Sequence, residues 1–554
     1  MNQKNKSYFV TYFFLFFLIN CFSQDFTLQL SSKFESEKKV LEKIDYIKKH
    51  ADTISSNLEI KRISEYLKNI GYFTNTIDSV KNIDKVKITF FSLNEKVETA
   101  IIRINNKIKF NLKNFRALND NFTVDIENLT QLLNQLTNHL DKTGKSFSKV
   151  QLKNIKIIKS KLFAEIEITE SKKRIINKVF IKGYEEFPKA YMKNYFNIKE
   201  NTIFNKEKIT EISKLAKGLS FINEIKPPEV LFTKDSTFIY LYLNKQQNNS
   251  FDGIINFASK ENGGILFNGN IDLKLNNILN TGESFELFWN SVGNERQEFR
   301  ISTEIPYIFN SKLSPEISFS LYKQDSSFVN TKFESKINYN FNPKLKLALT
   351  YESESSNTLQ ESVDNSLASF NTNFLGIQLQ YKVRKNDLFY NDKFLAQINP
   401  TFGKRSSNNN LSNQFKLKTV LSYIVDFNLR NSLYVKNENG LLNSSTYLTN
   451  ELYRIGGANS LRGFNEQSIF TSNYSSFNIE YRYLTSKKSY LYTITDIGFI
   501  KNLDSKSTLT GIGLGYFFKT NNSIVNIAIA TNNKAETQQK LESLQLIIRW
   551  KNIF

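Results

Sequence analysis

The chain of 554 residues carries a formal net charge of +21, and 40% of its residues are hydrophobic. This length exceeds what one hydrophobic core usually serves, so we expect several domains. One cysteine and two histidines exclude zinc sites of the usual kind and a disulfide framework, no cofactor is expected, and the mixing of basic with acidic residues argues against a nucleic-acid partner.

The N-terminus has the layout of a secretory signal peptide over residues 1–24. Two lysines precede an apolar run at residues 8–19, and small or polar residues follow at 20–24. A run of about twelve residues is too short to remain as a membrane span. The sequence that ends at Cys21 also resembles a lipoprotein box, so lipidation of this cysteine stays open as an alternative.

The region from residue 25 to 246 repeats with a period of about 74 residues, and such periodicity indicates tandem domains. Each copy contains a glycine-aromatic anchor after an amphipathic helix, where the glycine fits a C-terminal cap. The three anchors are Gly71-Tyr72-Phe73, Gly144-Lys145-Ser146-Phe147 and Gly218-Leu219-Ser220-Phe221. The repeat predicts domains at residues 25–95, 96–171 and 172–247.

Strands are expected on both sides of each anchor. A short strand and two helical stretches precede it, and an alternating strand with one buried face follows it. The expected first strands are Phe26–Leu30, Thr99–Ile104 and Ile175–Ile181. The expected alternating strands are Lys85–Leu93, Lys161–Thr169 and Ser236–Asn244. Each copy is therefore predicted to run strand, helix, helix, strand, strand, which is an α+β arrangement.

This order and size resemble the polypeptide-transport-associated (POTRA) domain of periplasmic proteins. The third copy carries the closest match, and the first copy is the most divergent. The residues that carry the match are Ile181-Lys182-Gly183-Tyr184, Phe187, Tyr191, Phe221-Ile222 and Pro227-Pro228. Three α+β domains with an unrelated role are the alternative interpretation.

The second half of the chain, residues 248–554, reads as an all-β domain. Segments of roughly ten alternating residues recur between turns rich in Asn, Ser and Lys, which is the pattern of a transmembrane β-barrel. About sixteen segments fit into this half, so we expect a 16-stranded antiparallel barrel. A soluble sandwich would show the same alternation. The signal peptide and the aromatic-rich apolar positions favour the membrane.

A polar loop near Leu442 to Thr471 contains the one distinctive motif of this half. Gly456 and Gly457 are followed by Leu461, Arg462, Gly463 and Phe464. A solvated surface loop is the plain interpretation. The glycines around an arginine and an aromatic residue suggest instead a loop folded into the lumen, where the guanidinium needs a carboxylate partner.

Candidate partners lie on the next two expected strands. In the strand Phe477 to Tyr483 the apolar odd positions face outward, so Glu480 and Arg482 face inward. The same alternation places Asp496 and Gly498 inside on the following strand. Two inward carboxylates on neighbouring strands are suited to bind one inserted arginine.

The last strand alternates Leu544, Leu546, Ile548 and Trp550 with Gln545, Ile547, Arg549 and Lys551, and the chain ends at Phe554. A terminal aromatic residue on an amphipathic final strand resembles the signal by which barrel proteins are recognised for outer-membrane insertion. Trp550 and Phe554 are the candidate residues of this signal.

Together these motifs resemble the BamA and TamA superfamily of outer-membrane assembly and translocation proteins. The resemblance covers essentially the whole mature chain, and three repeats before sixteen strands are most similar to the TamA layout. It implies that Arg462 with Asp496 and Glu480 holds the infolded loop and stabilises the working conformation of the barrel.

The resemblance also implies a non-enzymatic factor in the bacterial outer membrane, with its repeats in the periplasm. Implied partners are unfolded outer-membrane or secreted protein clients, outer-membrane lipids, and a periplasmic or inner-membrane partner protein. A two-partner-type secretion pore for one dedicated protein, or a barrel that transfers lipid or lipopolysaccharide, stays open as an alternative. No nucleophile element, phosphate-binding glycine loop or metal-spaced cluster in the sequence points to an enzyme.

Overall fold

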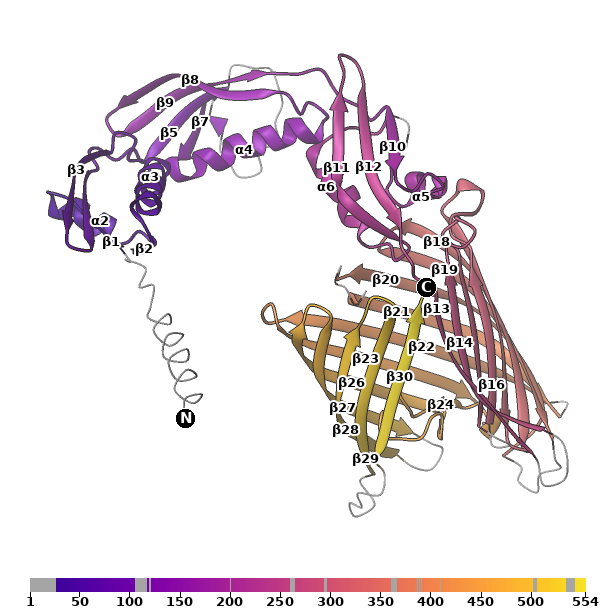
Figure 1. Cartoon of the computed structure of the whole chain (residues 1–554). Coiled ribbons are helices and arrows are strands. Elements are labelled where there is room, and N and C mark those ends of the chain that lie inside the picture. The colour runs from indigo at the N-terminus through magenta and orange to yellow at the C-terminus, as the bar shows by residue number, and fades with distance from the viewer. Residues whose placement is uncertain are drawn as a thin grey trace, which may run out of the picture. The chain divides into compact units, whose positions relative to one another are not determined.

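A computed structural model gives the architecture of the chain (Figure 1). It divides into two compact units, residues 1–175 with 203–206 and residues 176–202 with 207–554. The predicted signal peptide and Cys21 lie outside the described residues. The structure describes residues 26–104, 117–118, 121–199, 201–259, 265–292, 296–359, 366–385, 387, 389, 391–408, 410–501, 506–534 and 544–554.

The first sheet of the N-terminal unit has the strand order β2-β1-β4-β3. Its elements are β1 (Phe26–Ser31), α2 (Glu35–Leu41), β2 (Lys49–His50), α3 (Thr53–Asn69), β3 (Thr76–Ile83) and β4 (Val86–Ser92). Helix α3 begins where the Asp52 carboxylate accepts a hydrogen bond from the Ser55 amide at 2.6 Å. Ile63 and Leu67 of this helix are fully buried in one core with Phe91 of the sheet.

The second sheet has the strand order β6-β7-β5-β9-β8. Its elements are β5 (Thr99–Ile104), β6 (Ala117–Leu118), β7 (Asn121–Asp125), α4 (Ile126–Lys142), β8 (Lys149–Ile158) and β9 (Lys161–Thr169). The sequence predicts two helical stretches before the anchor of this copy, but its described residues contain only α4 there, and residues 121–125 form β7, which pairs with β5. Their alternation explains the strand, because Val124 is buried in the core and Phe122 packs against it.

The third sheet belongs to the C-terminal unit and has the order β10-β12-β11. Its elements are β10 (Lys178–Lys182), α5 (Lys189–Asn194), α6 (Lys206–Ala216), β11 (Ile222–Phe232) and β12 (Thr237–Lys245). The predicted strand Ile175–Ile181 begins later, at Lys178, because Ile175 instead forms an isolated bridge with Ile203. In all three sheets the first strand of the copy runs parallel to the last one.

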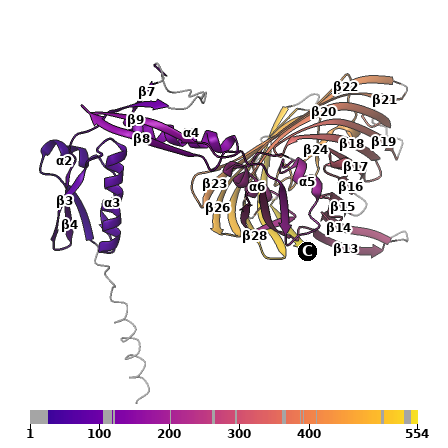
Figure 2. The same ribbon diagram turned by 90° about the horizontal axis from the view of Figure 1, so that it is seen from above.

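The remaining strands close into one barrel of sixteen antiparallel strands, which confirms the predicted fold class (Figure 2). They are β13 (Ser250–Ser259), β14 (Ile265–Asn276), β15 (Ser284–Val292), β16 (Arg296–Glu304), β17 (Leu313–Gln324), β18 (Phe328–Asn342), β19 (Leu345–Thr358), β20 (Phe370–Arg384), β21 (Asp392–Ser407), β22 (Asn410–Asp426), β23 (Asn431–Ser444), β26 (Asn473–Ser486), β27 (Ser489–Lys501), β28 (Lys506–Lys519), β29 (Ser523–Lys534) and β30 (Gln545–Ile553).

The two faces of the barrel wall differ in chemistry. Leu349, Leu375 and Phe402 lie on the outer face of the adjacent strands β19, β20 and β21 and are each about two-thirds exposed, at 66%, 67% and 66%. The inner face carries charged pairs such as Lys416 with Glu352, whose Nζ and Oε1 lie 2.8 Å apart. This is the alternation of a barrel with an apolar outside and a polar lumen. Among the helices of the described part, none has the length and apolar character of a membrane span.

The barrel closes through a short seam. Strands β13 and β30 pair only at Ser250↔Ile553 and Phe251↔Asn552 within the described residues. On its other side β13 pairs with β14 along its whole length, from Ser250↔Lys274 to Ser259↔Ile265. Among the described residues, the seam therefore has fewer paired positions than the neighbouring junctions of β13 with β14 and of β29 with β30.

Candidate functional site

The segment between the eleventh and twelfth barrel strands, β23 and β26, enters the barrel. We call residues 445–472 the infolded loop. It contains a short hairpin of β24 (Tyr453–Ile455) and β25 (Ile469–Thr471). Its tip forms hydrogen bonds with β27, β29 and β30 and also with β16, which lie at separate places around the closed wall. A segment that reaches all four strands must lie in the lumen.

Apolar packing seats the tip of the infolded loop. Leu461 and Phe464 are only 0% and 3% exposed. They form one cluster with Ile455 of the same loop and with Ile500 and Leu509, which point inward from β27 and β28. Full burial of such side chains stabilises a structure by roughly 1.5 to 3 kcal/mol each. Packing therefore positions the arginine that lies between Leu461 and Phe464.

Arg462 is bound through its backbone and its side chain to one carboxylate. Its amide donates to Asp496 Oδ2 at 2.8 Å, its Nε donates to the same oxygen at 2.9 Å, and an Nη donates to Oδ1 at 2.7 Å. The other Nη donates to Glu480 Oε1 at 2.5 Å. Asp496 is fully buried, so its charge is compensated by Arg462 rather than by water.

Glu480 has a second cation that the sequence did not suggest as its partner. Arg482, on the same inward face of β26, donates from Nε to Glu480 Oε2 at 2.8 Å. Its guanidinium lies 4.3 Å from the ring centre of Tyr434 and 5.3 Å from that of Tyr490. Glu480 therefore joins two arginines, whereas Asp496 depends on one.

Three glycines make room for the loop. A Cβ on Gly498 would lie 2.6 Å from the Leu461 side chain, and one on Gly511 would lie 2.1 Å from the carbonyl oxygen of Arg462. Gly463 has a φ of +92° and a Cβ there would meet the Thr531 backbone at 2.7 Å. The sequence analysis pointed to Gly463 and Gly498 but missed Gly511. The role of Gly511 in leaving space for the loop is seen only from the short distance between β28 and the loop.

The opposite end of the infolded loop has its own ionic anchor. Arg405, on the inner face of β21, forms an ion pair with Glu451 and donates to Thr446 Oγ1 at 2.5 Å. Asn450 is fully buried and donates to Ser356 Oγ at 2.7 Å. The sequence analysis missed these residues, because nothing in their local pattern differs from other polar loop residues.

The tip of the infolded loop also contacts both sides of the seam. On one side, Gln545 of β30 donates to Asn465 Oδ1 at 2.8 Å, and Arg549 of the same strand donates to Asn459 Oδ1 at 2.7 Å. On the other side Gln467 donates to Glu298 of β16 at 2.8 Å, and Arg296 of that strand donates to the carbonyl of Glu466. The loop therefore bridges the seam from inside.

The remaining residues singled out from the sequence lie outside the ionic cluster of Arg462, Glu480 and Asp496. Gly456 and Gly457 form the turn after β24, with φ of +109° and +91°. Trp550 and Phe554 are 59% and 50% exposed at the C-terminal end of β30. Within the described ranges, no group of His, Cys, Asp and Glu is arranged to hold a metal ion. Charge pairing at this site can hold the infolded loop in the lumen and link the two sides of the seam.

Comparisons with known proteins find one family match and several similar solved structures. Residues 174–244 match the POTRA family, described as the surface antigen variable number repeat. The structure of CdiB from Acinetobacter baumannii matches with a TM-score of 0.51 at 13% identity, over 90% of this chain and 98% of that one. CdiB from Escherichia coli matches at 13% identity with a TM-score of 0.49, over 89% of this chain and 98% of that one. BamA from Haemophilus ducreyi lacking POTRA domains 1–3 matches at 13% identity with a TM-score of 0.43, over 77% of this chain and 93% of that one. No curated protein matches the sequence.

Proposed function

Because the chain carries a POTRA domain at residues 174–244 ahead of a closed sixteen-stranded barrel, we propose that it inserts or translocates client proteins at the bacterial outer membrane. In this proposal the barrel lies in the membrane and the three repeats lie in the periplasm. The first two repeats are proposed as POTRA domains on their shared strand order.

The outer surface of the barrel supports the membrane placement. Next to the short turns on the side of the third repeat, the outward side chains are largely aromatic, as at a membrane interface. They include Tyr339, Phe341, Tyr381, Tyr423, Tyr483 and Trp550. Beyond them lie outward Leu and Ile residues such as Leu349 and Ile377. An apolar band with an aromatic girdle is the lipid face of an outer-membrane barrel.

The short seam is the observation that carries the proposed activity. A barrel stabilises itself in lipid by pairing every edge, and unpaired strand edges are costly there. The junction of β13 and β30 leaves most of that pairing unmade within the described residues. A client strand could complete it by edge addition, which is the same chemistry by which sheets bind extended peptides.

The third repeat supports delivery at the mouth of the barrel. Its Tyr184 hydroxyl donates to Asn280 Oδ1 at 2.6 Å in the turn between β14 and β15. Its Tyr191 ring lies 5.0 Å from that of Tyr307, in the turn between β16 and β17. Its sheet has two edge strands, β10 and β11, which are available for an extended client.

A disulfide across the seam tests the proposal. In the test variant, Ser250→Cys with Ile553→Cys joins paired positions of β13 and β30 across the seam. In the control variant, Ser302→Cys with Ser318→Cys joins paired positions of β16 and β17 inside a continuous ladder. We expect the seam disulfide alone to abolish client assembly in cells, with recovery after reduction. Proteins photo-crosslinked to β10 or β13 would be identified at the same time. Recovery of barrel precursors supports insertion, recovery of one secreted protein supports a dedicated secretion pore, and full activity of the locked seam would refute the proposal.

A further inference from the structure

A cluster of amide and hydroxyl side chains lies on the outer face of the barrel, where apolar residues are expected. Asn439 donates to Thr419 Oγ1 at 2.8 Å and to Asn437 Oδ1 at 2.7 Å. Asn437 donates to Ser475 Oγ at 3.2 Å. These residues come from the adjacent strands β22, β23 and β26. We call these four residues the outer polar cluster.

The strand registers place this cluster on the outside. Asn437 is the cross-strand partner of Phe477, whereas the inward Glu480 pairs with Tyr434. Residues that are partners across a ladder share a face, and the face alternates along each strand. Odd positions of β23 and β26 therefore face outward. Polar groups facing lipid are costly unless they are paired or have a binding role.

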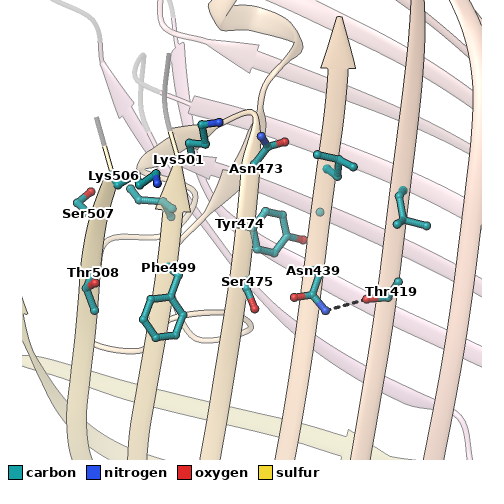
Figure 3. A pocket seen from close by; sticks show the side chains of 14 residues that line it. Thr419, Asn439, Asn473, Tyr474, Ser475, Phe499, Lys501, Lys506, Ser507 and Thr508 are labelled. Atoms are coloured by element: carbon teal, nitrogen blue, oxygen red, sulfur yellow. Dashed lines mark hydrogen bonds between the residues drawn. The ribbon is translucent and has the colours of Figure 1, made fainter. Parts of the chain in front are cut away.

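A groove of about 610 Å³ opens beside the cluster (Figure 3). Leu417, Leu441 and Phe499 supply apolar walls, and Lys501 and Lys506 lie at its end near the tips of β27 and β28. No acidic residue is among the described residues that line it. The groove therefore combines an apolar floor, hydrogen-bonding side chains and positive charge.

The positions of Lys501 and Lys506 favour the binding of an anion between them. Lys501 and Lys506 are direct cross-strand partners on the outer face, and both are exposed. Like charges directly opposite each other on a sheet destabilise it. An anion between the two ammonium groups removes this repulsion and adds charge-assisted hydrogen bonds.

The register also orders the groove from end to end. Asn473 and Lys501 are partners in one row, and Ser475 and Phe499 are partners in the next. Successive rows on one face of a strand are about 7 Å apart. Ammonium groups thus lie one row beyond the outer polar cluster, on the side away from the third repeat. This is the order of phosphate and then ester or amide linkage along a phospholipid or glycolipid.

We infer that this groove binds a phosphate-bearing lipid of the outer leaflet, with the phosphate on Lys501 and Lys506 and the linkage region on the outer polar cluster. The inference rests on the membrane placement in the proposed function. Leu417, Leu441 and Phe499 line the phosphate and linkage end of the groove. Phe477 and Ile497 are outward partners in the row beyond Ser475, and they then contact the acyl chains. A lipid held beside β26 to β28 lies on the wall that supports Arg462 from within.

Photo-crosslinking of the full-length protein tests the inference. The photoreactive amino acid benzoylphenylalanine replaces Phe499 in the groove or, as the control, the outward Phe402 of β21. Each protein is placed in phosphatidylethanolamine nanodiscs with labelled diphosphorylated lipid A, with lipid A lacking its phosphates, or with phosphatidylglycerol. We expect labelling by diphosphorylated lipid A at position 499 and little at 402. The double change Lys501→Gln and Lys506→Gln should reduce the labelling at position 499 on the order of tenfold at low salt.

Two controls keep the outcome decisive. Lys404→Gln removes an exposed outward lysine of β21 and should leave labelling unchanged. Asn437→Leu with Asn439→Leu should weaken labelling without changing the charge. Equal labelling at 402 and 499, crosslinks to a second copy of this chain, or no effect of the lysine changes would overturn the inference. Client assembly is not part of the assay, so the failure of the proposed activity would leave a positive result standing.

Discussion

Lys551 on the last strand forms an ion pair with Asp272 on the second strand, at 2.5 Å between Nζ and Oδ2, although β13 lies between the two strands. Asp252 of β13 is the cross-strand partner of Asp272, so the lysine lies near two carboxylates. This contact spans the short seam from inside the lumen, because it joins β30 to β14 across β13. We regard it as a latch of the seam, together with the infolded loop.

Lys551→Gln should loosen the seam. Both side chains are partly exposed, at 29% and 22%, so the pair stabilises the closed state by at most about 1 kcal/mol. We expect faster hydrogen exchange of the β13 and β30 amides and unchanged exchange elsewhere. Lys274→Gln is the matched control, since its partner Glu286 lies on the neighbouring strand and does not span the seam. Equal exchange in both variants would mean that the pair is not a latch.

Arg462→Ala should lower barrel stability more than any other single change in the infolded loop. Breaking a buried ion pair costs roughly 3 to 5 kcal/mol, and water in the lumen reduces this. The temperature at which the barrel loses its compact gel mobility measures the effect. Arg430→Ala, in the exposed turn between β22 and β23, is the control. Arg454 is a poorer control, because it stacks 3.7 Å from the ring centre of Tyr322.

The two carboxylates should respond differently to the loss of Arg462. Asp496 then has no cation, whereas Glu480 keeps Arg482. Adding Asp496→Asn to Arg462→Ala should therefore restore part of the lost stability, and adding Glu480→Gln should not. Double-mutant cycles on the same melting measurement check this, and equal rescue by both changes would contradict the arrangement described.

Gly511→Ala should displace the infolded loop without changing any charge. The new methyl group would lie 2.1 Å from the Arg462 carbonyl oxygen, which belongs to the backbone and cannot move away alone. Overpacking of this kind costs about 1 to 3 kcal/mol. We expect the loop to become sensitive to added protease. Thr510→Ala, which faces outward on the same strand, should leave it resistant.

The first repeat should lose stability in acid through Glu59. The side-chain hydrogen bond from Arg62 lowers the pKa of this carboxyl below its ordinary value of 4.5. A lowered pKa in the folded state stabilises the fold above about pH 4.5, and this stabilisation disappears as the pH falls through the lowered value. Thermal melting of residues 25–95 between pH 6 and 3 should show this loss. Glu59→Gln should flatten the dependence, and an unchanged profile would exclude Glu59 as the cause.

Local patterns predicted much of this protein. Period-two alternation sets which residues of a strand share a face, so Glu480 and Asp496 could be placed inside before any contact was known. The anchors at Gly71 and Gly144 mark helix ends, because a residue with positive φ ends a helix regardless of tertiary context. These are properties of neighbouring residues, and the sequence contains them directly.

The tertiary structure decided what depends on barrel closure. Lys551 and Asp272 are 279 residues apart, and Gln467 and Glu298 are 169 apart. Such pairs leave no periodic signal, since each residue alone is an ordinary inward polar side chain. The space that Gly511 leaves for the Arg462 carbonyl likewise arises only when β28 and the loop meet. Closure of the wall brings these groups within bonding distance, and that is a property of the whole fold.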